Sequence, residues 1–309
     1  MRSRFAALLL LAAAPLAGAQ AQAAKKAKTI DQLAAMYDSA RCKSCHEEIY
    51  AQWEKSHHAR PFLGVAEGLM LIPVVRSSAF QVKSPKEATL KTFPCFKCHL
   101  PQAVTHAEDS VAAELAEALF TASDKDKPDK DKAAAKAKVA KLQITCIVCH
   151  NEKAIAHKLV LGPPEANVIY GAKDLPSHED KVFTKGKKSA IMGQAIFCGQ
   201  CHGTGPNFEF DYPIQCATLY ASYQSAYLSR GGLQSCQECH MKPVGGRPDH
   251  LFSPNFNDKE GTSKFLAQNI SLDVETLGYQ WLRKAGALTP MIVVNTKIGN
   301  RAGHRIPDG

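Results

Sequence analysis

A cysteine pattern repeated five times constrains this chain of 309 residues more than any other feature. Ten of its 11 cysteines fall into C-x-x-C-H motifs at 42–46, 95–99, 146–150, 198–202 and 236–240. The cysteines are Cys42, Cys45, Cys95, Cys98, Cys146, Cys149, Cys198, Cys201, Cys236 and Cys239, and the histidines are His46, His99, His150, His202 and His240. Two thiols three positions apart can add to the two vinyl groups of one porphyrin, and the following His can then bind the iron. Each motif therefore predicts one covalently bound haem c.

Other uses of cysteine fit this pattern less well. Five disulfides would not need a His after every second Cys. Structural zinc usually takes two C-x-x-C pairs per metal and makes no demand on the adjacent residue. Thioredoxin-like sites occur singly, beside a βαβ pattern. The sequence therefore predicts five haem c groups. Cys216, outside the motifs, is interpreted as a buried structural residue, with a free reactive thiol as the alternative.

The N-terminus is typical of a secretory signal peptide at 1–23. A basic start with Arg2 and Arg4 precedes an apolar run at 5–16 that is short for a bilayer span, and small-x-small cleavage sites follow it. A retained anchor helix is the alternative. No second apolar stretch of transmembrane length follows, so we expect a mature chain without a transmembrane segment, in the periplasm or on the outer cell surface.

The net charge of +9 has a natural explanation in the predicted cofactors. Each haem carries two propionates, so five haems would add about ten negative charges, which nearby Lys and Arg would stabilise. An exported protein has no obvious contact with nucleic acid, and we predict none.

The segments between the motifs favour a mainly α fold with much irregular coil and a short β element near the C-terminus. We predict helices at 47–60, 111–121 and 216–228, because apolar or aromatic residues recur there at helical spacing. Residues 122–138 are dominated by Lys, Asp and Ala and are predicted to be a solvated charged insertion.

The predicted domains are a haem-cored unit at 24–260 and a C-terminal segment at 261–309. In the latter, 273–284 is interpreted as a helix closed by Gly286 and 291–294 as a short strand. The turn signal at 307–309 would normally lead into another strand, which suggests a truncated form.

Seven further histidines could supply the second axial ligands. They are His57, His58, His106, His157, His178, His250 and His304. Their number allows a complete bis-histidine set, and the methionines are interpreted as packing residues. In a helix His57 lies on the face of His46, whereas His58 points about 100° away. We therefore favour His58 as the ligand of a neighbouring haem.

Several connecting motifs resemble known multihaem cytochromes. The run W-E-K-S-H-H-A at 53–59 resembles the W-x-x-S-x-H-A element of cytochromes related to the tetrahaem electron acceptor of hydroxylamine oxidoreductase. Residues 149–158, 169–171 and 215–220 resemble bacterial multihaem cytochromes of extracellular electron transfer. The run G-H-R-I-P-D-G at 303–309 resembles the G-H-x-x-P-x-G element found beyond the last haem in this group.

The resemblance, which runs from about Arg41 to the end, implies a set of distal ligands. Matched residue by residue, it assigns this role to His58, His178 and His304, and it suggests His250 as a further ligand. His157 is preferred as the fifth ligand, with His106 as the alternative.

The sequence and the resemblance together predict a pentahaem c-type cytochrome that transfers electrons. Its partners would be redox proteins, such as a quinol dehydrogenase, another cytochrome or a terminal acceptor, and its haems would all be six-coordinate and low-spin. A reductase of nitrite, hydroxylamine or a sulfur oxyanion, with one open haem, is the alternative, although the chain lacks the C-x-x-C-K motif of pentahaem nitrite reductases. Self-assembly into a haem filament is a third possibility.

Overall fold

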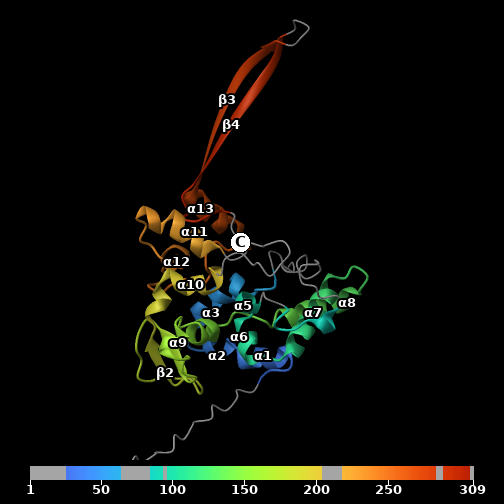
Figure 1. Ribbon diagram of the computed structural model, residues 1–309, viewed down its shortest axis with the longest axis vertical. Helices are drawn as coiled ribbons and strands as arrows, with labels where there is room; N and C mark the ends of the chain where they lie inside the picture. Colours follow the sequence, from blue (N-terminus) through green and yellow to red (C-terminus); the bar gives the residue numbers. More distant parts are fainter. Residues whose placement is uncertain (1–25, 64–83, 93–95, 204–217, 283–287, 307–309) are drawn as a thin grey trace, which may run out of the picture.

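A computed structural model describes residues 26–63, 84–92, 96–203, 218–282 and 288–306. Helices joined by long irregular connections make up most of it, which confirms the mainly α prediction (Figure 1). The α-helices are α1 (Ile30–Met36), α2 (Ala40–Lys43), α3 (Glu47–Glu54), α5 (Phe96–His99), α6 (Pro101–His106), α7 (Asp109–Ser123), α8 (Asp129–Val139), α9 (Lys158–Leu161), α10 (Ala195–His202), α11 (Leu219–Ala226), α12 (Cys236–His240) and α13 (Lys259–Asn269). The predicted signal peptide and Cys216 lie outside the described residues.

Short helical turns and four strands complete the described structure. The turns are η1 (His57–Ala59), η4 (Pro85–Glu87), η5 (Val148–Glu152), η6 (Ala190–Gly193) and η7 (Leu228–Arg230), of which η5 is a π-helix. The strands β1 (Val168–Gly171) and β2 (Lys185–Lys188) pair in parallel, and β3 (Ile270–Leu282) and β4 (Leu288–Asn300) form an antiparallel hairpin.

The apolar core lies in the N-terminal half of the chain. It joins α1, α5, α6, α7 and α8, and its most deeply buried side chains include Ile30, Phe96 and Leu115. Thr29 caps α1 by accepting a hydrogen bond from the backbone N–H of Gln32. Beyond Phe183, the described part of the chain contributes no buried apolar side chain, although the fourth and fifth motifs lie there. This C-terminal region therefore lacks an apolar core made of its own side chains. Haem groups packed between its helices would supply one.

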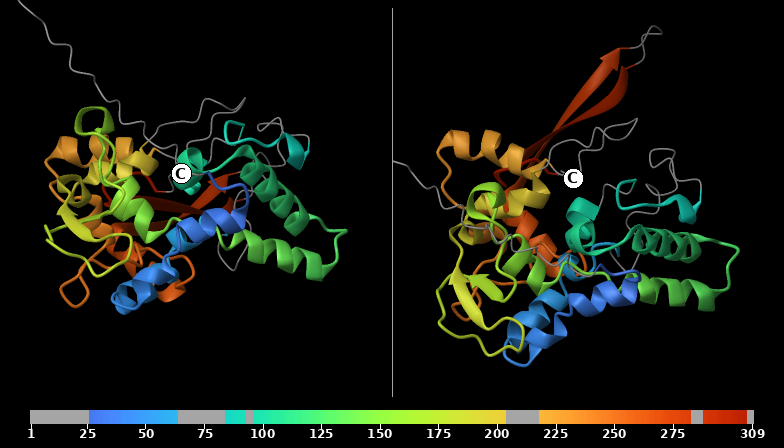
Figure 2. Two further views of the ribbon diagram at one scale, coloured as in Figure 1. Left: turned by 90° about the horizontal axis from the view of Figure 1, so that it is seen from below. Right: turned by 60° about the horizontal axis from the view of Figure 1, so that its bottom comes forward.

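The charged segment after α7 packs, contrary to the sequence prediction. Residues 129–139 form α8, which lies beside α7, and Ala135 and Val139 are buried against the core (Figure 2). The prediction of a wholly solvated insertion is therefore wrong for this stretch. Its alanines allow close helix packing, while its Lys and Asp side chains occupy the remaining faces.

The helix predicted at 47–60 is interrupted. α3 ends at Glu54, Ser56 is extended, and His57 belongs to the separate turn η1. Tertiary contacts outside the reach of a local pattern fix this break. The indole N–H of Trp53 donates to the carbonyl of Ile144 (3.0 Å), and the Asn255 side chain donates to the carbonyl of Lys55 (2.8 Å).

The helix predicted at 273–284 is wrong over its described residues, which belong to β3. Side chains there alternate with the period of a strand: Leu272 and Val274 share one face, and Asp273 and Glu275 share the other. The strand predicted at 291–294 is confirmed within β4. The hairpin extends away from the helical body at the end of α13 (Figure 1).

Candidate haem centres

Six histidines of the predicted ligand set are oriented in the same way. In each, the ring Nδ1 lies at hydrogen-bond distance from a backbone carbonyl, which can only accept, so Nδ1 must carry the proton. The bonds run from His99 to Pro61, His150 to Tyr170, His178 to Phe183, His240 to Ser253, His250 to Pro248 and His304 to Arg305. This tautomer leaves the Nε2 lone pair free, as is usual for histidines that bind a metal.

Four pairs of imidazoles face each other at nearly equal distances. In each pair one ring belongs to a C-x-x-C-H motif and the other to the predicted distal set. The ring centroids are separated by 6.5 Å for His46 and His178, 6.3 Å for His58 and His202, 6.3 Å for His150 and His250, and 6.0 Å for His240 and His304. The interplanar angles are 11°, 82°, 20° and 23° in the same order.

These separations fit an iron between the two rings. Imidazole–metal bonds of about 2.0 Å on opposite sides of one metal place the two ring centroids about 6 Å apart. Among the described residues, no group of three or more His, Cys, Asp or Glu side chains could hold a free metal ion. Haem iron needs only two protein ligands, because the porphyrin supplies the other four.

His58 and His57 are adjacent in sequence but differ in their surroundings. His58 is deeply buried, which lowers its pKa to about 3, and its ring lies opposite that of His202. The Nε2 atom of His57 instead accepts the backbone N–H of Phe256 at 3.3 Å. The lone pair that would bind iron is therefore already in use in His57 and available in His58.

The second motif differs from the other four. All twelve histidines lie in the described part of the chain, yet no second imidazole faces His99, whose ring centroid lies 6.0 Å from that of Phe62. His106 directs its Nε2 at Glu152 (3.3 Å), and His157 is exposed. The structure therefore brings neither of the two candidates for the fifth distal ligand to a motif histidine.

The described cysteine thiols bring the motifs into contact with one another. Cys42 of the first motif touches Cys146 of the third, which lowers the pKa of Cys146 to about 7. Pairs from other motifs touch in the same way, namely Cys98 with Cys201 and Cys198 with Cys236. Cys149 lies within electrostatic range of both cysteines of the fourth motif. Cys95 lies outside the described residues.

Local structure presents the two cysteines of the fourth and of the fifth motif on one helix face. In α10 and α12 the two thiols are three positions apart, which places them side by side on a helix. Ser235 begins α12 with a capping box, in which its side chain accepts from the Glu238 N–H and Glu238 accepts from the Ser235 N–H. The start of the fifth motif is thereby fixed.

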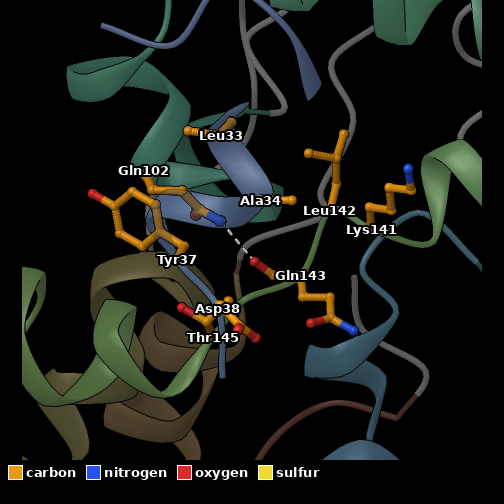
Figure 3. Close-up of a pocket in the computed structure, with 9 residues that line it drawn as sticks. All are labelled: Leu33, Ala34, Tyr37, Asp38, Gln102, Lys141, Leu142, Gln143 and Thr145. Atoms are coloured by element: carbon orange, nitrogen blue, oxygen red, sulfur yellow. Dashed lines mark hydrogen bonds between the residues drawn. The ribbon is translucent and has the colours of Figure 1, made fainter. Parts of the chain in front are cut away.

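The third motif is held from its N-terminal side by α6. The Gln102 side chain donates to the carbonyl of Gln143 at 2.7 Å, three residues before Cys146 (Figure 3). Both residues line a cavity of about 210 Å³ between α1 and the segment that leads into the motif. Gln102 is buried, so this bond helps to determine where the third motif begins.

An ion pair that sequence reasoning missed positions His178. Arg41, directly before the first motif, donates to both carboxylate oxygens of Asp180, with a shortest distance of 2.8 Å. Burial raises the pKa of Asp180, but the N–H groups of Phe183 and Val182 and the Arg41 guanidinium outweigh it and lower the pKa overall. The pair thus ties the loop that carries His178 to the helix that begins the first motif.

We expect Arg41→Ala to loosen His178 from its position opposite His46. A charge-assisted hydrogen bond contributes about 1.5–3 kcal/mol, and the partly exposed side chains of this pair place it at the lower end. A pH titration of the haem-containing variant should show one haem changing from low-spin to high-spin in a fraction of the molecules as the pH falls. This change should begin at a higher pH than in the wild-type protein. Asp180 stabilises the fold above its ordinary pKa and loses this effect as pH falls through its lowered value. Identical spectra across the titration would contradict this role.

Gly303 allows His304 to reach its partner. It adopts a positive φ of 76°, and a Cβ there would lie 3.1 Å from the ring of Tyr227. Because the backbone at Gly303 passes close to the Tyr227 ring, the next residue, His304, lies opposite His240. Tyr227 follows α11, which occupies part of the helix predicted at 216–228. Gly231 adopts a left-handed φ and ends the adjacent turn η7.

Comparison with known proteins identifies one related family. Residues 41–119 match the family described as "Cytochrome c554 and c-prime", a range that contains the first two C-x-x-C-H motifs and His58. No curated protein and no solved structure matches the chain. At the level of the family, the match supports a multihaem c-type cytochrome that binds haem covalently and has a role in electron transfer.

Proposed function

We propose that this chain is an exported pentahaem c-type cytochrome that passes electrons between redox partner proteins. The observation that carries the proposal is the set of four imidazole pairs at 6.0–6.5 Å, each of which contains one motif histidine. An iron with two imidazoles has no free position for a substrate. It keeps the same ligands in both oxidation states, so it gains and loses an electron with little rearrangement.

The thiol contacts support a definite order of the haems in space. Numbered by motif, haem 1 meets haem 3 through Cys42 and Cys146, and haem 4 meets haem 5 through Cys198 and Cys236. The proximity of Cys149 to the fourth motif supports a contact of haem 3 with haem 4, and the 3.5 Å between the Cys98 thiol and the Cys201 carbonyl supports a position of haem 2 beside haem 4. The proposed route runs from haem 1 through haems 3 and 4 to haem 5, with haem 2 as a side branch.

Redox proteins are the proposed partners. The two ends of the route, haem 1 and haem 5, are the natural points of contact with a donor and an acceptor, such as a quinol dehydrogenase, another cytochrome or a terminal acceptor. None of the helices that the structure describes combines the length and apolar composition needed to cross a bilayer. The predicted signal peptide and the family match support a location in the periplasm or outside the cell.

A second candidate function rests on His99. With no imidazole opposite it among the described residues, its haem would have an open position where a small molecule could bind or react. This favours a side activity, such as the reduction of a small nitrogen or sulfur compound, over the wholly closed haem set that the sequence predicts.

We expect the reduced holoprotein to bind one carbon monoxide per five haems. Carbon monoxide needs an open ferrous iron, and only the haem at His99 lacks a second imidazole. The stoichiometry can be measured by titration of the visible spectrum, and His99 can be assigned by loss of the signal when Cys95 and Cys98 are replaced by Ala. Binding of none, or of two or more, would contradict the ligand assignment.

The same complex tests whether haem 2 lies on the electron route. Carbon monoxide closes haem 2 but leaves the other four irons unchanged. If the protein is an electron carrier, its reduced carbon monoxide complex should still reduce an added small cytochrome from four haems at the normal rate. If electron delivery stops, haem 2 lies on the route and the proposed side-branch arrangement is wrong.

A further inference from the structure

A second cavity lies at the base of the β3–β4 hairpin, beside the fifth haem site. It has a volume of about 420 Å³ and is lined by Ala226, Tyr227, Arg230, Gly231, Gly232, Asn300, Arg301, Gly303 and His304. One of these residues, His304, is the proposed distal ligand of haem 5. The cavity therefore adjoins the space that this haem would fill.

The charge of the cavity is positive. Arg230 and Arg301 both line it, and among the described residues no Asp or Glu does. Neither arginine forms an ion pair within the part of the chain that the structure describes. Two guanidinium groups without carboxylate partners beside one opening are well suited to bind paired carboxylates, because each guanidinium can hold an oxyanion in a bidentate geometry.

The backbone around the two arginines is well defined. Arg301 follows directly after β4 and donates its backbone N–H to the carbonyl of Asn269 at 2.8 Å, which ties it to the end of α13. Arg230 ends the turn η7, before the left-handed Gly231. Tyr227 lies between these two chain segments, and a Cβ on Gly232 would approach its ring to 2.4 Å. The two chain segments that carry the arginines thus both pack against the ring of Tyr227.

We propose that Arg230 and Arg301 bind the two propionates of haem 5. The inference rests on the proposed function, because it requires a haem at the fifth motif. It explains why two cations that form no ion pair with a described residue lie beside His304, and it makes use of the positive net charge that the sequence analysis attributes to propionates. Ferric bis-histidine haem carries one more positive charge than the ferrous form. Adjacent guanidinium groups therefore favour the ferrous form and raise the potential of haem 5.

The test is an electrochemical titration of the holoprotein monitored by electron paramagnetic resonance. Haem 5 is identified as the signal lost when Cys236 and Cys239 are replaced by Ala. In the double variant Arg230→Gln and Arg301→Gln, we expect the ratio of oxidised to reduced haem 5 at a fixed potential to rise about tenfold, which corresponds to about 59 mV. Each single variant should produce a smaller change of the same sign.

The matched control is Lys264→Gln on α13. Lys264 also carries one positive charge near the fifth motif, but it is exposed and pairs with Glu260 at 2.6 Å. Its removal should leave haem 5 unchanged. An unchanged potential in the double variant, or an equal shift in all five haems, would overturn the proposal. A third result would also overturn it: the wild-type holoprotein binds added inorganic phosphate and the double variant does not. The arginines would then bind a free oxyanion and not the propionates.

Mass spectrometry distinguishes this result from failure of the proposed function. If the double variant retains five haems and haem 5 does not shift, the propionate assignment alone is wrong. If the wild-type protein carries no haem at the fifth motif, the pentahaem proposal is wrong as well.

Discussion

His178→Ala should leave all five haems covalently attached and convert one of them from low-spin to high-spin. The thioether bonds and the proximal His46 do not depend on His178, so the cofactor stays in place. Its iron loses the imidazole that lies 6.5 Å from His46, measured between ring centroids. Electron paramagnetic resonance should count four low-spin haems and one high-spin haem in the wild type, and three low-spin and two high-spin haems in the variant. The reduced variant should also bind two molecules of carbon monoxide per chain, one more than the wild type.

His157→Ala is the matched control for this variant. His157 comes from the same predicted distal set, but it is exposed and faces no motif histidine. Its replacement should leave the ratio of spin states unchanged. If His157→Ala instead creates the new high-spin haem and His178→Ala does not, the pairing argument is wrong and the prediction based on resemblance holds for His157.

Removal of haem 4 should interrupt electron transfer along the chain. The double variant Cys198→Ala and Cys201→Ala abolishes its covalent attachment. The thiols of the fourth motif contact the second and fifth motifs and lie within electrostatic range of the third. Electron tunnelling decays exponentially with distance, so exchange between haem 3 and haem 5 should slow by orders of magnitude. Rapid-mixing reduction followed at the haem bands should show a fast phase for haems 1 and 3 and a separate slow phase for haem 5.

The corresponding control removes haem 1 through Cys42→Ala and Cys45→Ala. Among the described thiols, Cys42 contacts only the third motif, so the loss of haem 1 should leave the exchange between haems 3, 4 and 5 fast. Four remaining haems in each variant, counted by mass, would show that the rest of the protein matured. Fast reduction of haem 5 without haem 4 would contradict the proposed order.

The cysteine motifs could be predicted from sequence because their chemistry is local. The spacing that binds one porphyrin is set within five residues, and no tertiary contact changes it. The orientation of the ligand histidines could not be predicted in this way. His150 and His250 are 100 positions apart in the chain, and the carbonyl groups that fix the tautomers of both rings carry no sequence signal.

Two errors in the fold have a common cause. The segment at 273–282 contains residues that suit either a helix or a strand, and its pairing with 288–300 decides for the strand. The segment at 129–139 has few apolar residues, and its contact with α7 decides for a packed helix. In both cases a neighbour that is not evident from the local pattern determines the structure. Conversely, Arg41 was not identified because its partner Asp180 is distant in sequence.

Electron paramagnetic resonance of the oxidised holoprotein tests the ligand geometry most directly. Ring planes within 23° of each other, as in three of the pairs, give rhombic low-spin signals. The 82° between His58 and His202 makes two iron d orbitals nearly equal in energy and gives a strongly anisotropic low-spin signal. We therefore predict three rhombic low-spin haems, one strongly anisotropic low-spin haem and one high-spin haem per chain. Five low-spin haems, or more than one high-spin haem, would contradict the four imidazole pairs on which the proposed function depends.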